Sequence, residues 1–323
     1  MNERDEQDLV RLAESVRAGE RRAVAKAITL VESERPSDRS SRERLLSELA
    51  KAGSPALRLG ITGAPGVGKS TLIDALGLYA VSEGHRVGVL AIDPSSVKTG
   101  GSLLGDRTRM GRLGASPSAF VRPSPSGGAS GGIGKRSREA LLVLEAAGYD
   151  LLMLETVGVG QGELAVTDCV DVLLVLQMAG AGDDVQSLKR GVLEHADLVV
   201  FTKADGPRLD ETRAARDALA ALFAAFRSDS PSVLALSALS ESDARELFRA
   251  TLAKRDALLL SGELEERRRI QRRAWFRSAL DEAFRERLAR EQALTREQSE
   301  LEAAVERGDI LPPLAARRLI ERL

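Results

Sequence analysis

Residues 57–71 read LRLGITGAPGVGKST, and the fold of this chain can be predicted outward from them. It starts with a short apolar run, continues through a glycine-rich turn to Gly68, Lys69 and Ser70, and leads into the helical pattern TLIDALGLYAV. A strand, a glycine-rich loop and a helix in this order are typical of a phosphate-binding loop. The glycines let the backbone curl so that several N–H groups point at one anion, and the helix N-terminus adds a partial positive charge.

A loop of this kind predicts a bound nucleotide. We expect the Lys69 ammonium group to reach the β- and γ-phosphates, and the Ser70 hydroxyl group to ligate Mg²⁺. The residues predicted to contact the nucleotide in this stretch are Gly63, Ala64, Pro65, Gly66, Val67, Gly68, Lys69, Ser70 and Thr71.

Short apolar runs separated by helical segments and polar turns fill the middle of the chain. They are LRLGIT, RVGVLAI, SAFVRP, DLLMLET, DVLLVLQ, DLVVFT and SVLALS. Strands that are apolar on both faces and spaced by helices indicate an α/β fold, with a mostly parallel sheet covered by helices on both faces. Ligands of such sheets bind outside the carboxyl ends of the strands, so the residues that follow each run are the candidates for chemistry.

The two ends of the chain have helical spacing instead. We expect a helical N-terminal extension over residues 1–53, a nucleotide-binding domain over 54–258 and a C-terminal helical arm over 259–323. In the N-terminal part, ERPSDRSS interrupts the pattern, and Ser41 is expected to cap the next helix. In the arm, Phe276, Leu280 and Phe284 fall on one apolar helical stripe, which favours a packing or dimerising helix over nucleic-acid binding.

Composition excludes several classes of function. The 323 residues carry a formal net charge of −1, so no overall field attracts nucleic acid or anionic membranes. The longest apolar runs are far shorter than the roughly 18 residues that cross a bilayer, and the N-terminus has no signal-peptide pattern, so we expect a cytoplasmic protein. Cys169 is the single cysteine and is expected to be a buried thiol, while His85 and His195 lack metal-ligand spacing.

Three acidic residues stand at or just beyond predicted strand ends. They are Asp93, Asp106 and Glu155. Magnesium bound to a nucleotide keeps several waters, and carboxylates nearby hold those waters in place. We therefore predict that Asp93, Asp106 and Glu155 organise the metal with Ser70, and that Lys69, Asp93 and Glu155 are the catalytic candidates.

Two glycine-containing segments follow strand ends and are candidate nucleotide-sensing switches. The first is TVGVGQG, residues 156–162, directly after Glu155, and the second is AGAGDDVQSLKRG, residues 179–191. A loop next to the γ-phosphate can change shape when that phosphate is lost. The residues assigned to these switches are Gly158, Gly160, Gln161, Asp183, Asp184, Gln186 and Lys189.

Base recognition is predicted at FTKAD, residues 201–205. Guanine presents N1–H and N2–H donors on one edge, which the Asp205 carboxylate can accept together, while the aliphatic stem of Lys203 can cover one face of the base. A backbone N–H in the turn Ser237, Ala238 and Leu239 can meet the guanine O6 atom. Thr202 stands where this motif usually has Asn, and its single hydroxyl group can take only part of the bracing role of Asn.

These strings together resemble the MeaB/ArgK family. GAPGVGKST, IDPSSVKTGGSLLGDRTRM, VRPSPSGG, ETVGVGQGE, GAGDDVQSLKRG and TKAD occur in the order and with the spacing of that family, and the resemblance covers nearly the whole chain. The family consists of P-loop GTPases that act as chaperones of adenosylcobalamin-dependent acyl-CoA mutases, chiefly methylmalonyl-CoA mutase. The resemblance implies GTP hydrolysis to GDP, coupled to loading and protecting a B12 coenzyme, by a homodimer joined through the C-terminal arm.

Two other functions fit a phosphate-binding loop. A metal-delivery GTPase would need a cluster of His or Cys, and this chain has two histidines and one cysteine. An ATP-dependent small-molecule kinase would need a substrate lid and would have no reason to place an aspartate in the guanine-reading position. Intrinsic hydrolysis is expected to be slow, because the sequence assigns no arginine or glutamine to the transferring phosphoryl group; Arg109 is a candidate, and a surface salt bridge is the alternative for it.

Overall fold

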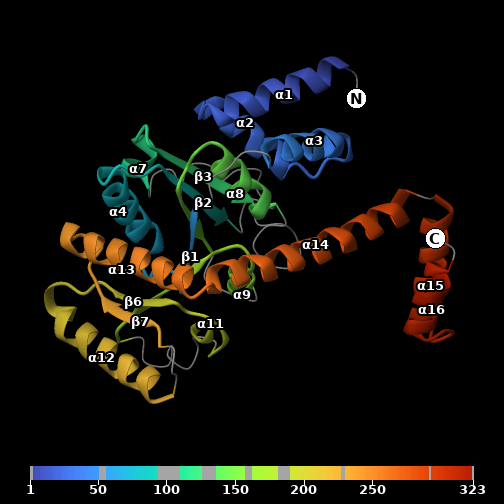
Figure 1. The fold of residues 1–323 in the computed structure, drawn as a ribbon. Coiled ribbons are helices and arrows are strands. Elements are labelled where there is room, and N and C mark those ends of the chain that lie inside the picture. The colour runs from blue at the N-terminus through green and yellow to red at the C-terminus, as the bar shows by residue number, and fades with distance from the viewer. Residues whose placement is uncertain are drawn as a thin grey trace. The chain divides into compact units, whose positions relative to one another are not determined.

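The computed structural model describes residues 3–50, 56–93, 110–125, 136–156, 162–180, 190–226, 230–290 and 292–321. The chain divides into two compact units, Met1–Glu265 and Glu266–Leu323. The first unit holds all strands of the described residues (Figure 1).

A seven-stranded sheet forms the centre of the first unit. In spatial order it consists of β3 (Ala119–Pro125), β2 (Val87–Asp93), β4 (Leu151–Glu155), β1 (Leu57–Gly63), β5 (Val172–Met178), β6 (Leu198–Thr202) and β7 (Ser232–Ala235). Every pair of neighbours is parallel. Each strand coincides with one of the predicted apolar runs, so the α/β fold class is confirmed.

Alternate residues of the central strands enter two different cores. In β5, Val172 and Leu174 belong to the core on one face, while Leu173 and Val175 belong to the core on the other. Successive side chains of a strand point to opposite faces, so a strand buried on both sides must be apolar throughout. This is why the sequence shows unbroken apolar runs instead of an alternation of apolar and polar residues.

Helices cover both faces (Figure 1). One core includes residues of α4 (Lys69–Ser82), α7 (Gly111–Ala115) and α13 (Glu241–Leu260). The other includes residues of α1 (Glu3–Arg17), α2 (Arg21–Glu32), α3 (Arg39–Leu49), α8 (Ser137–Ala146), α11 (Arg190–Glu194) and α12 (Leu209–Phe226). The short α9 (Gly162–Ala165) and the 3-10 turns Pro36–Asp38, Val166–Asp168 and Gly206–Arg208 complete this unit.

The predicted N-terminal helices are present and pack into the first unit, where Val24, Ile28 and Leu45 are fully buried. The prediction that Ser41 caps the third of them is wrong, because α3 begins at Arg39. Pro36 opens a 3-10 turn that runs directly into α3, and the Asp38 carboxylate accepts a hydrogen bond of 2.5 Å from the Ser33 hydroxyl group. This bond lowers the pKa of Asp38.

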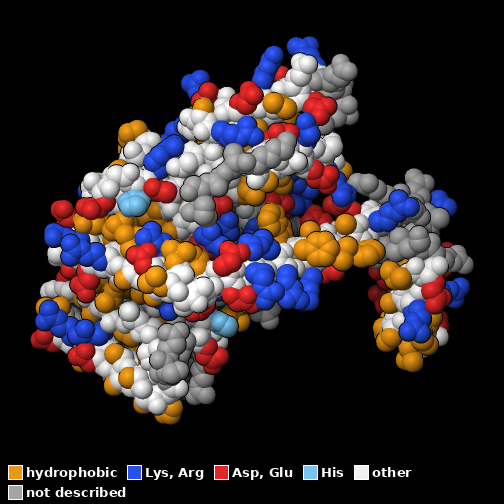
Figure 2. All heavy atoms as spheres, in the orientation of Figure 1, with side chains coloured by type: hydrophobic (Ala, Val, Ile, Leu, Met, Phe, Trp, Pro, Cys, Tyr) orange, Lys and Arg blue, Asp and Glu red, His pale blue; other side chains and the backbone are white. Residues whose placement is uncertain are grey.

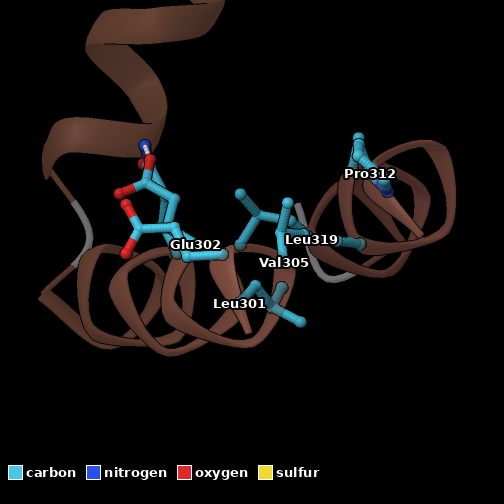
Figure 3. Close-up of a pocket in the computed structure, with 9 residues that line it drawn as sticks. Leu301, Glu302, Val305, Pro312 and Leu319 are labelled. Carbon is cyan, nitrogen blue, oxygen red and sulfur yellow. Dashed lines mark hydrogen bonds between the residues drawn. The ribbon is translucent and has the colours of Figure 1, made fainter. Parts of the chain in front are cut away.

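The second unit is helical. It contains most of α14 (Glu263–Arg290), with α15 (Gln292–Glu306) and α16 (Pro312–Ile320). Leu301, Ala315 and Leu319 are its buried apolar residues, and a groove of about 460 Å³ opens between α15 and α16 (Figure 3). In the described ranges, no helix has both the length and the apolar character that a membrane span requires.

Apolar side chains lie on the surface of α14 (Figure 2). Phe276 is 67% exposed, and Leu280 and Phe284 are also exposed. These three residues belong to the predicted apolar stripe, which the described residues of one chain leave exposed.

Candidate nucleotide-binding site

The phosphate-binding loop connects β1 to α4 at the carboxyl edge of the sheet. Gly63 ends β1, and a Cβ atom at this position would lie 2.6 Å from the carbonyl oxygen of Leu176 on β5. Gly68 precedes α4 with a φ of 103°, in the left-handed region that favours glycine. The loop therefore needs glycine at Gly63 for a close approach and at Gly68 for its backbone conformation.

Lys69 is the first residue of α4, and its side chain folds back over the loop. Its Nζ atom donates to the carbonyl oxygens of Gly63 at 2.8 Å and Ala64 at 3.1 Å. The side chain is buried. A positive charge therefore lies at the helix N-terminus and inside the loop, which is where the charge of a phosphate group is stabilised best.

Ser70 and Glu155 come from different elements and meet at this loop. The Ser70 hydroxyl group donates to Glu155 Oε1 at 3.0 Å, and Glu155 is only 8% exposed at the end of β4. Next to them, the Thr156 hydroxyl group donates to Thr62 Oγ1 at 2.8 Å, which ties the end of β4 to the end of β1. Two of the predicted metal-site residues are thus within hydrogen-bonding distance of each other.

The other two predicted metal-site residues are placed less fully. Asp93 is the last residue of β2, and its backbone is opposite Pro125 in the parallel ladder with β3. β2 is the neighbour of β4, so Asp93 ends a strand at the same edge of the sheet as Glu155. Asp106 lies outside the described residues.

The predicted base-reading residues form a second cluster at the carboxyl ends of β6 and β7. Asp205 Oδ2 accepts a hydrogen bond of 2.5 Å from the Ser237 hydroxyl group, and the Ala204 N–H donates to the Leu236 carbonyl oxygen at 3.2 Å. Lys203 has a φ of 59° and is the non-glycine residue of the described chain with positive φ. Lys203 and Asp205 are both exposed, so both are accessible to a ligand.

The turn after β7 is held by the start of α13. The Ser237 N–H donates to Asp243 Oδ2 at 2.7 Å, and Ser240 caps the helix by accepting from the Asp243 N–H. In this turn, Ala238 is half-buried and Leu239 is 85% exposed. The sequence predictions did not include Asp243, although Ser240 and Asp243 have the spacing of a helix capping box, with Asp in place of Glu.

Thr202 connects the phosphate-binding loop to the segment that is predicted to read the base. Its hydroxyl group lies 2.6 Å from the carbonyl oxygen of Val67 in the phosphate-binding loop and 3.2 Å from that of Gln177 on β5. A hydroxyl group has one proton, so the shorter contact to Val67 takes the hydrogen bond. The residue before Lys203 therefore braces the loop that carries Lys69, and it is buried.

The predicted switch residues Gly158, Gly160, Gln161, Asp183, Asp184, Gln186 and Lys189 lie outside the described residues, as does Arg109. The segments do have described neighbours on both sides: Thr156 and α9 for the first, Gly180 and α11 for the second. The helices α9 and α11 are in contact with each other.

The remaining titratable candidates are structural. Cys169 is buried, and this burial raises the pKa of its thiol, as expected for an unreactive cysteine. His85 lies 3.2 Å from Asp150 and packs edge-on against Phe248, and His195 is exposed. Among the described residues, no group of three or more His, Cys, Asp or Glu could hold a metal ion by itself.

A parallel sheet with a phosphate-binding loop after its first strand, and with an aspartate-bearing turn after its sixth, defines a P-loop GTPase. Comparison with known proteins agrees with this class. The chain matches the family described as "Methylmalonyl Co-A mutase-associated GTPase MeaB" over residues 24–293. This chain belongs to the MeaB family.

Several relatives extend over nearly the whole chain. The Escherichia coli protein named "GTPase ArgK" is 41% identical over 317 residues, which cover 96% of each chain. The Mus musculus protein named "Methylmalonic aciduria type A homolog, mitochondrial" is 36% identical over 335 residues, which cover 99% of this chain and 81% of that protein. A solved structure entitled "Crystal structure of LAO/AO transport system kinase" has a TM-score of 0.73 at 34% identity and covers 99% of this chain and 98% of its own.

Proposed function

We propose that this GTPase gates the loading and protection of adenosylcobalamin in a B12-dependent acyl-CoA mutase, methylmalonyl-CoA mutase or a close relative. The observation that carries the proposal is the family match over residues 24–293, because the description of that family names association with methylmalonyl-CoA mutase. The name of the mouse relative points to the same metabolism.

In this proposal the nucleotide occupies the carboxyl edge of the sheet. The backbone N–H groups of residues 63–71 and the Lys69 ammonium group bind the phosphates, and Lys69 offsets charge that develops on the phosphoryl group during hydrolysis. Asp205 accepts from the guanine N1–H and N2–H groups, Lys203 covers the base, and the turn Ser237, Ala238 and Leu239 meets the O6 atom. The bond between Asp205 and Ser237 supports this assignment, because it fixes the carboxylate beside that turn.

The donor set suits Mg²⁺. Ser70 offers a hydroxyl oxygen and Glu155 a carboxylate oxygen 3.0 Å away, and hard oxygen donors are what this ion takes in proteins. Ser70 would ligate it directly, while Glu155, Asp93 and Asp106 would hold its waters. Bound there, the ion would neutralise charge on the β- and γ-phosphates.

Hydrolysis is proposed to be slow in the isolated protein and faster with the partner. The predicted switch segments around Gly158 and Asp183 follow strands that end at the nucleotide, so the mutase could reorder both of them. The result of GTP hydrolysis is then a change in the shape of the switch segments that the partner recognises.

We propose that residues 1–53 form the N-terminal extension, residues 54–258 the GTPase domain, and residues 259–323, which include the second unit, a homodimerisation arm. The exposed stripe of Phe276, Leu280 and Phe284 supports the arm, since apolar surface of this kind marks a protein contact.

The proposal is tested by steady-state GTP hydrolysis with and without purified methylmalonyl-CoA mutase. We expect turnover to rise at least severalfold with the mutase and to saturate at a fixed ratio of the two proteins. Lys69→Ala, which removes the charge from the loop, serves as the inactive control. If turnover is the same with every B12-dependent acyl-CoA mutase tested, while GTP hydrolysis itself is normal, the partner assignment is wrong and the GTPase assignment stands.

A further inference from the structure

The N-terminal helix α2 runs along β3, which is the edge strand of the sheet. The Arg21 guanidinium group donates to the carbonyl oxygens of Gly114, Ser116 and Ala119, where the chain enters β3. Eleven residues further along the helix, Glu32 contacts the other end of the strand. The two ends of β3 are therefore held separately by two residues of one helix.

The contact at the carboxyl end of β3 is a cluster of four hydrogen-bonded side chains. Glu32 Oε1 accepts from the Ser124 hydroxyl group at 2.6 Å, and Glu32 Oε2 accepts from Arg122 Nη2 at 2.6 Å. The same Arg122 nitrogen also donates to Thr29 Oγ1 at 3.3 Å. Glu32 has 9% of its side chain exposed, and Ser124 is 4% exposed. Hydrogen bonds from charged groups in such a sheltered place are stronger than neutral ones on the surface.

The pairing of β3 with β2 connects this contact to the edge of the sheet that is proposed to bind the nucleotide. Ser124 is opposite Ile92 in the β2–β3 ladder, and the next pair is Pro125 opposite Asp93. Glu32 thus fixes the strand position directly beside the residue at which β2 ends. An edge strand has a neighbour on one side only, so its end is the part of a sheet most in need of such support.

We propose that Glu32 is a positioning residue for the metal-proximal end of the nucleotide site, acting through Ser124 on the strand end that carries Asp93. The inference rests on the metal-organising role of Asp93 put forward under the proposed function. It gives the N-terminal extension a part in nucleotide chemistry in addition to its part in stability. A displaced Asp93 would weaken the hold on Mg²⁺ waters and leave the phosphate-binding loop intact.

The test compares the two ends of the α2–β3 contact in the full-length protein. Ser124→Ala and Glu32→Gln disturb the carboxyl end, and Arg21→Met disturbs the opposite end while it keeps an apolar stem against Phe120. Calorimetry measures GDP affinity with and without Mg²⁺, and hydrolysis is titrated with Mg²⁺. Thermal unfolding reports the loss of stability in each variant.

We expect Ser124→Ala and Glu32→Gln to raise the Mg²⁺ concentration for half-maximal hydrolysis severalfold, in the same direction as Asp93→Asn. Their Mg²⁺-dependent gain in GDP affinity should fall in parallel, with Mg²⁺-free affinity within about twofold of wild type. Arg21→Met should unfold at a lower temperature with unchanged Mg²⁺ dependence. Asp93→Asn is the reference, and it should show the same Mg²⁺ defect.

Two results would overturn the inference in distinguishable ways. If Asp93→Asn shows the Mg²⁺ defect and both Ser124→Ala and Glu32→Gln lack it, Glu32 has only a structural role. If Asp93→Asn itself leaves the Mg²⁺ dependence unchanged, the metal role proposed for Asp93 fails and the inference falls with it.

Discussion

The Thr202 hydroxyl group bridges two parts of the site that are 135 residues apart in the sequence. It bonds the Val67 carbonyl oxygen in the phosphate-binding loop, while the next residues, Lys203 and Asp205, belong to the base-reading turn. Because Thr202 is buried, removing its hydroxyl group would leave that carbonyl oxygen without its partner. The threonine in place of the usual asparagine therefore keeps a connection between the phosphate-binding loop and the segment that we propose to read the base.

This bridge gives a prediction for Thr202→Val, which has nearly the same shape and no hydroxyl group. We expect GDP and GTP affinity to fall by about 1 kcal/mol, or roughly fivefold, which is the net contribution of one hydrogen bond. Thr202→Ser keeps the hydroxyl group and should stay within about twofold of wild type. Calorimetry measures both, and equal affinities for the valine and serine variants would show that the bond to Val67 does not support binding.

Asp205 is predicted to select the base. In Asp205→Asn, the side-chain oxygen can still accept from Ser237, but the amide nitrogen would face the guanine 2-amino group, donor against donor. We expect GDP affinity to drop by at least 10-fold, about 1.4 kcal/mol. Affinity for XDP, which has a carbonyl oxygen at that position, should rise relative to GDP. An equal loss of affinity for GDP and for XDP would mean that Asp205 does not bind the N1–H and N2–H edge of guanine.

Among the elements, the start of α13 holds the turn that we propose to contact the base. Asp243 accepts from the Ser237 N–H and from the Ser240 hydroxyl group, so one carboxylate serves both the helix cap and the turn. A substitution at this end of the helix should therefore change the affinity for the nucleotide.

Asp243→Ala tests this connection. We expect a loss of about 1 kcal/mol in the free energy of unfolding, as for other capping residues, together with a severalfold loss of GDP affinity. Glu241→Ala, in the same first turn and exposed, is the matched control and should change neither by more than about 0.5 kcal/mol. Urea unfolding and calorimetry give the two quantities. A stability loss with unchanged GDP affinity would confine Asp243 to a capping role.

The sequence predicted those elements whose pattern is local. Each strand is an unbroken apolar run because it is buried on both faces, and the loop from Gly63 to Ser70 is recognisable from its glycines and lysine. Contacts between distant segments could not be predicted in this way. The bonds from Arg21 to carbonyl oxygens near β3, and from the Ser124 hydroxyl group to Glu32, depend on how α2 packs on the sheet edge, and this packing leaves no signature in the sequence. The start of α3 was missed because the 3-10 turn that begins at Pro36 leads directly into the helix at Arg39, before the cap expected at Ser41.

In the whole molecule, the described candidates for the nucleotide site and the exposed apolar stripe lie in different units. All placed nucleotide-site residues belong to Met1–Glu265, and the exposed stripe of Phe276, Leu280 and Phe284 belongs to Glu266–Leu323. The residues of the stripe are spaced by four, so they share one face of α14.

If this stripe joins two copies, replacing its aromatic residues should give monomers. We expect the double variant Phe276→Ser and Phe284→Ser to sediment as a monomer at concentrations where wild type is a dimer, since burial of each aromatic ring contributes a large apolar area. Arg277→Ser, on the same turn of α14, is the control and should remain a dimer. A dimeric double variant would place the interface elsewhere.

We propose that nucleotide state in this protein controls coenzyme transfer into a mutase. The most direct measurement is the rate at which the apo form of methylmalonyl-CoA mutase takes up adenosylcobalamin, followed by absorbance, in the presence of this protein with GTP, with GDP or with no nucleotide. We expect the rate of uptake to depend on which nucleotide is bound. Lys69→Ala should abolish the difference between the rates with GTP and with GDP. Uptake at one rate under all conditions, with GTP hydrolysis intact, would contradict it.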